Sequence, residues 1–137
     1  MNQTSSFNRV ETLLGRPGSS HSVLLTSFRR NGQGVGTPVG MKAMAGKLYF
    51  MTPASSGKVK RLAHTSHVTL ALCTFRGQTL GPPVDGAARR LVGHEAKQAR
   101  KWICAGVAGW IVNAVFTVRY PSDKTAVYEV ALLSREQ

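Results

Sequence analysis

The sequence predicts a mainly β domain of the α+β class, a six-stranded antiparallel barrel with short flanking helices. Short apolar runs rich in β-branched and aromatic residues recur along the chain, separated by tight turns, as is typical of hairpin-linked strands. Only two or three stretches have helical spacing, so a doubly wound parallel sheet is not expected. With 137 residues, of which 42% are hydrophobic, the chain is expected to form one domain with its own core.

The first three strands are expected to form an antiparallel meander. Asn31-Gly32 is the strongest hairpin signal in the chain, and residues 44–47 form a second tight turn. Pro38 has no N–H to give to a ladder, so its strand lies at an edge or is bulged there. A flat ligand could approach such an edge, although a plain edge strand explains the proline equally well. The six strands are expected over residues 21–28, 35–44, 47–51, 66–74, 84–93 and 125–133.

The rest of the chain supplies the helices. The domain over 1–137 divides into an N-terminal helix and turn, a barrel core, a helical segment and a closing strand, over residues 1–18, 19–94, 95–118 and 125–134. Helical spacing is expected over residues 5–15, 55–64 and 95–107.

Residues 102–118 carry no charge. This run is at the lower limit for a membrane span and favours a buried helix or a dimer-facing surface. A substrate pocket and a peripheral membrane contact through Trp102 and Trp110 stay open as alternatives.

The charge calls for an acidic partner or cofactor. Eighteen basic residues against 6 acidic ones give a formal net charge of +12. Nucleic acid, an anionic membrane and a polyanionic small molecule all satisfy that charge, and composition does not choose among them.

Cys73 and Cys104 form no CxxC pair, and the histidines lack the spacing of a metal motif. We therefore expect a reducing compartment and no metal. The polar N-terminus shows no signal-peptide pattern, so we expect a cytoplasmic protein, with membrane association as the alternative.

Residues 52–62 hold the most informative stretch. A strand leads into a turn bearing hydroxyls and glycine, and then into a helix whose first turns contain Lys58, Lys60 and Arg61. Basic residues in a first turn oppose the helix dipole unless an anion lies between them, so we interpret the stretch as a phosphate clamp. A serine N-cap followed by solvated cations is the plainer reading. No Walker-type ending is present, which excludes a P-loop.

Six segments in order resemble the F420-dependent flavin/deazaflavin oxidoreductase family, which shares the FMN-binding type of split β-barrel found in pyridoxamine phosphate oxidases. The resemblance spans roughly residues 10–133. Its segments are LLTSFRRNG at residues 24–32, GTPV at 36–39, YFMT at 49–52, SGKVKRL at 56–62, VTLALC at 68–73 and GPPVDGAA at 81–88.

The resemblance implies a homodimer with the cofactor at the barrel edge, near the subunit interface. The strand at Thr37, Pro38 and Val39 would lie against the deazaflavin ring. The phosphate and the negatively charged tail would be held by Thr52, Ser55, Ser56, Lys58 and Arg61, with Lys60 a weaker candidate. Gly40 departs from the family, which often has an aromatic residue there; the change either leaves room over the ring or weakens ring packing.

The resemblance further implies hydride transfer from reduced coenzyme F420 to a lipophilic or conjugated small molecule. The cofactor carries that chemistry, and no side chain stands out as an obligatory acid, so we assign no catalytic residue. The alternatives are an FMN-binding split-barrel oxidase or reductase, a non-catalytic deazaflavin-binding protein and, least favoured, a nucleic-acid-binding barrel. Aromatic residues are too few and too little interleaved with basic ones to favour a specific nucleic-acid site.

Overall fold

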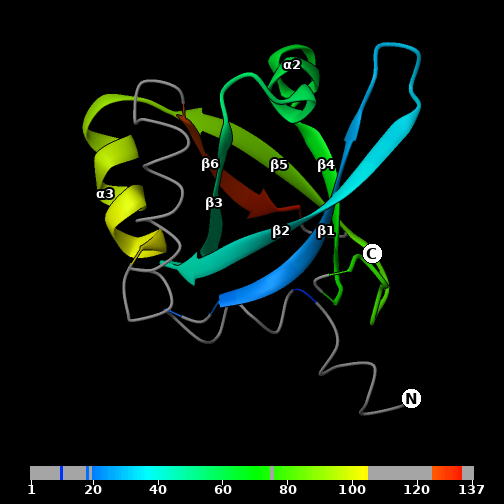
Figure 1. The fold of residues 1–137 in the computed structure, drawn as a ribbon, viewed down its shortest axis with the longest axis horizontal. Helices are drawn as coiled ribbons and strands as arrows, with labels where there is room; N and C mark the ends of the chain where they lie inside the picture. Colours follow the sequence, from blue (N-terminus) through cyan, green and yellow to red (C-terminus); the bar gives the residue numbers. More distant parts are fainter. Residues whose placement is uncertain (1–9, 11–17, 19, 75, 105–124, 134–137) are drawn as a thin grey trace.

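The computed structural model describes residues 10, 18, 20–74, 76–104 and 125–133. These residues include six strands and two helices (Figure 1). The strands are β1 (Ser20–Phe28), β2 (Gly34–Met44), β3 (Lys47–Pro53), β4 (His67–Leu72), β5 (Val84–Leu91) and β6 (Thr125–Leu132). The helices are α2 (Gly57–His64) and α3 (Gly93–Ile103).

The strands close into an antiparallel barrel in the order β1-β2-β3-β6-β5-β4. The predicted fold class and the predicted meander of the first three strands are confirmed. α2 lies over one end of the barrel next to β1, whereas α3 lies along its side against β3 and β6 (Figure 1). The segment expected as a helix over 5–15 lies outside the described residues apart from Val10, which is fully buried in the core.

β2 is paired on both sides only near its end. Residues 34–42 of β2 pair with β1, but β3 joins it only at Lys42, Ala43 and Met44. Among the described residues, the first part of β2 therefore has one strand neighbour and one open edge. Pro38 lies in this part, where its missing N–H breaks no ladder, so the prediction of an edge is confirmed.

The barrel interior is filled by alternate residues of every strand. The largest fully buried side chain is Phe50, whose ring stacks on Tyr128 at a centroid distance of 5.2 Å. A second cluster between α3 and the outer face of the barrel includes Tyr49, Val127 and Ala99. The barrel has a closed core inside and a helix fixed to its outer face.

Several predicted boundaries are wrong by a few residues. β3 continues to Pro53, past 51, and α2 begins at Gly57, not at 55. β5 ends at Leu91, short of 93, because Gly93 takes a φ of 60°, in the left-handed region where a strand cannot continue. α3 begins at that glycine and ends at Ile103, not 107, since Cys104 already leaves helical geometry. β4 ends at Leu72, short of 74, because Thr74 closes a turn by accepting the amide of Gly77.

The turn between β2 and β3 has two residues with positive φ. Ala45 has a φ of 57° and Gly46 a φ of 78°. Two successive left-handed residues are typical of the tight hairpin turn whose twist matches the flanking strands. Ala45 adopts this conformation at a cost that glycine or asparagine would not have.

Candidate anion and cofactor site

The N-terminus of α2 is arranged to receive an anion. Ser56 is the N-cap, with extended backbone at φ −69° and ψ 157°, but its hydroxyl makes no capping hydrogen bond. The first turn holds no acidic residue that could offset the positive end of the helix dipole. Val59 and Leu62 pack against the barrel core and fix the helix in place. The start of α2 is therefore positive, and the side chain of its own N-cap residue leaves it uncapped.

Arg61 links α2 to the barrel wall. Its Nε donates a hydrogen bond of 2.6 Å to Oγ of Ser27, which is fully buried on β1. The guanidinium lies over Gly57, where a Cβ would stand only 2.7 Å from Nη1. Glycine at this position therefore gives Arg61 the space to lie across the start of α2.

The cations here repel one another. Burial lowers the pKa of Lys58, and the charge of Arg61 lowers it further. Burial also lowers the pKa of Arg61, with a second contribution from Arg29 in the turn after β1. An anion bound among these groups would relieve the repulsion and favour their charged forms.

No carboxylate in the described ranges neutralises these cations, because all three are bound elsewhere. Asp85 contacts His67 at 3.0 Å. Glu95 and Glu129 both accept hydrogen bonds from Arg89. Within the described residues, the positive charge at α2 therefore has no carboxylate partner.

Arg29 is the member of this cluster that sequence reasoning missed. It follows the end of β1 two positions after Ser27, so the two-residue period of the strand carries it toward the side on which Arg61 binds. The strand period was visible in the sequence, but the pairing of Ser27 with Arg61 was not.

The open part of β2 presents its predicted residues on two faces. Thr37 lies opposite Leu25, and Val39 lies opposite Val23. Both β1 residues are fully buried, so Thr37 and Val39 face inward. Pro38 alternates to the outer face and is exposed.

Gly40 shares the outer face with Pro38. Nothing lies within 4 Å of the position that a Cβ would take there. The departure from an aromatic residue therefore leaves open space at this point of the strand.

Thr37 carries an unsatisfied polar atom. Its Oγ1 is buried and has no hydrogen-bond partner within the described part of the chain. A buried hydroxyl without a partner costs about 1–3 kcal/mol. On β1, Ser27 is the diagonal neighbour of Thr37 on the same face of the sheet. The hydroxyl of Thr37 is therefore near Ser27, the residue that accepts the hydrogen bond from Arg61. A ligand that reaches both would satisfy this hydroxyl and the cations together.

The remaining predicted residues divide into support and surface. Thr52 is buried, and its Oγ1 donates a 3.2 Å hydrogen bond to Oγ of Ser56. Ser55 and Lys60 are exposed. The structure thus brings Ser56, Lys58 and Arg61 to one helix end, with Thr52 behind them and Ser55 and Lys60 at the periphery.

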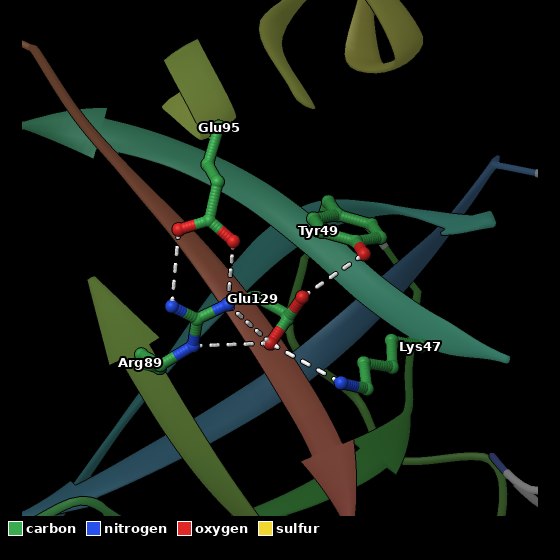
Figure 2. A network of polar contacts seen from close by, with 5 residues as sticks. All are labelled: Lys47, Tyr49, Arg89, Glu95 and Glu129. Atoms are coloured by element: carbon green, nitrogen blue, oxygen red, sulfur yellow. Dashed lines mark hydrogen bonds and ion pairs between the residues drawn. The ribbon is translucent and has the colours of Figure 1, made fainter. Parts of the chain in front are cut away.

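Tyr49 lies on the other face of β3, away from Thr52. Its hydroxyl donates to Glu129 at 3.1 Å, within a network that Arg89, Lys47 and Glu95 complete (Figure 2). Burial, together with the hydrogen bond and charge of Glu129, raises the pKa of Tyr49 to about 12. A hydroxyl held in this way on the outer face is unsuited to give a proton to a ligand at the β2 edge.

The described residues offer neither a metal site nor a membrane-spanning helix. Within the described residues, no three His, Cys, Asp or Glu side chains gather as they would around a metal ion. In the same residues, no helix has the length and apolar character needed to cross a membrane. Trp102 packs edge-on against Tyr49 at 5.2 Å, and residues 105–118 of the uncharged run lie outside the described part.

Comparison with known proteins shows similarity in the fold alone. No protein-family model matches the sequence, and no curated protein matches it significantly. Among solved structures, the provisional pyridoxamine 5'-phosphate oxidase from Listeria innocua matches with a TM-score of 0.58 at 12% identity, over 90% of each chain. The fold is that of these split barrels. The topology around the β2 edge therefore belongs to a known architecture.

Two further split barrels differ in what they hold. An FAD-binding protein from Mesorhizobium loti matches with a TM-score of 0.60 at 15% identity, over 90% of this chain and 86% of that one. HutZ, the heme storage protein from Vibrio cholerae, matches with a TM-score of 0.65 at 7% identity, over 92% and 89%. Split barrels thus include an oxidase-like protein, a flavin-binding protein and a heme storage protein, and the site residues have to decide among such roles.

Proposed function

We propose that this split barrel is an F420-dependent oxidoreductase that transfers hydride from the reduced deazaflavin to a lipophilic or conjugated small molecule. The observation that carries the proposal is the unneutralised cation cluster at the N-terminus of α2, next to the unpaired hydroxyl of Thr37. A ligand with a polyanionic end and a ring bearing polar atoms fits both features.

The residues of this chain would bind the cofactor and orient it. Lys58 and Arg61 would hold the phosphate and the charged tail, with the uncapped first turn of α2 adding backbone donors. Thr37 would donate its hydroxyl to the ring edge, Val39 would line the same face of the strand, and Pro38 would lie on its outer face. The bound cofactor supplies the hydride; the barrel fixes its position relative to the acceptor.

The proposal includes a homodimer in the cytoplasm, with the second subunit completing the pocket beside the open edge of β2. That edge pairs with β1 alone in the described residues, so backbone groups are left for a ligand or a partner. FMN shares a phosphate and a flat ring with F420, so the experiment has to distinguish binding of F420 from binding of FMN.

The test is a set of titrations of the purified protein with coenzyme F420, FMN and heme, followed by fluorescence or absorbance. F420 is expected to bind most tightly. Lys58→Gln is expected to weaken F420 binding by about tenfold, the effect of losing one charge-assisted contact. Lys101→Gln is the matched control, since it removes an exposed charge from α3 at a position outside the site.

Catalysis is checked by following oxidation of reduced F420 with a panel of conjugated acceptors. If F420 binds tightly but none of the acceptors is reduced, the result would contradict the enzymatic activity and favour a non-catalytic deazaflavin-binding protein. Preferred binding of FMN, or equal losses in Lys58→Gln and Lys101→Gln, would contradict the proposed cofactor or its clamp.

A further inference from the structure

A second positively charged site lies at the corner where β5 ends, α3 begins and β6 starts (Figure 1). A cavity of about 280 Å³ opens there. Its lining comes from three elements and consists of Arg90, Leu91, Val92, Gly93, Ala96, Lys97, Arg100, Thr125 and Val127.

Among the described residues of the lining, three are cations and none is an acid. Arg90 comes from the end of β5, and Lys97 and Arg100 come from successive turns of α3. Within the described residues, these three side chains make no ion pair and no hydrogen bond, and the three described carboxylates are bound to other groups. Like charges around one cavity repel, so an anion would stabilise this corner.

The floor of the cavity is apolar. Leu91 and Val127 are buried cross-strand partners, and Ala96 closes the floor from α3. At the rim, Val92 leaves 71% of its surface exposed, the highest fraction among the large hydrophobic residues of the described chain. A cationic rim over an apolar floor matches a ligand with one anionic group and an apolar body.

This cavity is separate from the clamp at α2. The clamp faces the inner side of the sheet, through Arg61 and Ser27. Leu91 and Val127 lie on the outer face, in the cluster beneath α3. The two sites can therefore be occupied and mutated independently.

We propose that this corner binds a small amphipathic organic anion, a carboxylate or similar group joined to a short apolar chain or ring. The anionic group would lie among Arg90, Lys97 and Arg100, and the apolar part would lie on Leu91, Val127 and Ala96. The concave shape and limited volume favour a small molecule over a nucleic acid, whose backbone requires an extended basic stripe.

The test uses octanoate as probe, with inorganic phosphate and 1-octanol as comparators, in a ¹⁵N–¹H NMR titration of the whole protein. Octanoate is expected to shift the amides of residues 91–97, Arg100 and Val127. Phosphate lacks the apolar part and octanol lacks the charge, so each is expected to bind at least several-fold more weakly.

The double variant Lys97→Gln/Arg100→Gln is expected to weaken octanoate binding by at least tenfold, whereas Lys101→Gln, on the same helix but outside the lining, leaves it unchanged. Lys58→Gln should not change octanoate affinity, and the double variant should not change F420 affinity. The two proposals can therefore be contradicted independently of each other. Shifts centred on other residues, equal binding in the double variant, or tighter binding of an oligonucleotide at these residues would overturn the proposal.

Discussion

A single glycine gives the candidate clamp its shape. Gly57 stands at the first position of α2, where its missing side chain lets the guanidinium of Arg61 lie across the helix start and reach Ser27. Sequence reasoning placed glycine in a turn. The structure gives it a second role, as the space that an arginine fills.

We predict that Gly57→Ala separates stability from binding. Alanine gains up to about 1 kcal/mol of helix propensity, but loss of the hydrogen bond from Arg61 to buried Ser27 costs about as much, so the free energy of unfolding should change little. The new Cβ would push Arg61 from its place, and F420 affinity should fall by about tenfold. Denaturant unfolding and a cofactor titration measure the two effects. An unchanged affinity would show that the position of Arg61 over Gly57 is irrelevant to binding.

A second residue-scale prediction concerns the turn between β2 and β3. Ala45 holds a φ of 57°, which asparagine adopts more readily and which the Asn-Gly turn favours. Ala45→Asn should raise the free energy of unfolding by roughly 1 kcal/mol and the melting temperature by roughly 4 °C. Ala63→Asn, at an exposed position within α2, is the control and should not stabilise. A lower melting temperature for Ala45→Asn would contradict the strain at this turn.

At the scale of elements, the network in Figure 2 connects β3, β5, β6 and α3. Glu129 of β6 is its centre, with 13% of its side chain exposed. Burial opposes its ionisation, but hydrogen bonds from Arg89 and Tyr49 and the charges of Arg89 and Lys47 outweigh this, so the pKa of Glu129 is lowered. The network thus connects α3 to the outer face through Arg89, which bridges Glu95 of α3 and Glu129 of β6.

The lowered pKa makes the stability of the barrel depend on acid pH. A carboxyl whose pKa is lower in the folded state stabilises above its unfolded value, near 4.5, and loses that contribution as the pH falls through the folded value. Glu129→Gln should cost roughly 1 kcal/mol at pH 7, a modest amount because Arg89 is half exposed. The difference between the variant and the parent should shrink below about pH 4.5. Thermal melts across pH 3 to 8 measure this difference in stability. A difference that stays constant with pH would show that the carboxylate of Glu129 is not the source of the pH dependence.

Element positions were largely readable from the sequence, whereas the contacts between elements were not. Alternating apolar residues and turn signals placed all six strands, and Pro38 identified the open part of β2. The end of β5 was misplaced because glycine at 93 gives no indication of its φ. Arg29 and the centre at Glu129 were missed because their partners lie on elements distant in the chain, and local periodicity carries no information about such pairings.

For the whole molecule, the net charge of +12 should govern ligand affinity through salt. Increasing NaCl from about 50 to 500 mM should weaken F420 binding several-fold, since screening acts on the exposed cations around the clamp. Lys58→Gln should reduce this salt dependence, and Lys101→Gln should leave it unchanged. Titrations over a salt series give the slope. If the dependence of F420 affinity on salt is the same in the parent and in Lys58→Gln, the attraction comes from the net charge of the protein as a whole and not from the cations at α2.

The position of β6 also shapes how the chain is made. This strand lies between β3 and β5 in the barrel, yet it follows both in the sequence. A nascent chain that has not released β6 from the ribosome has two adjacent sheet edges and an incomplete core that includes Phe50. Exposed edges and apolar surface are the usual starting points of aggregation. Among the described strands, β6 is therefore the one whose pairing closes the barrel and covers the edges of β3 and β5.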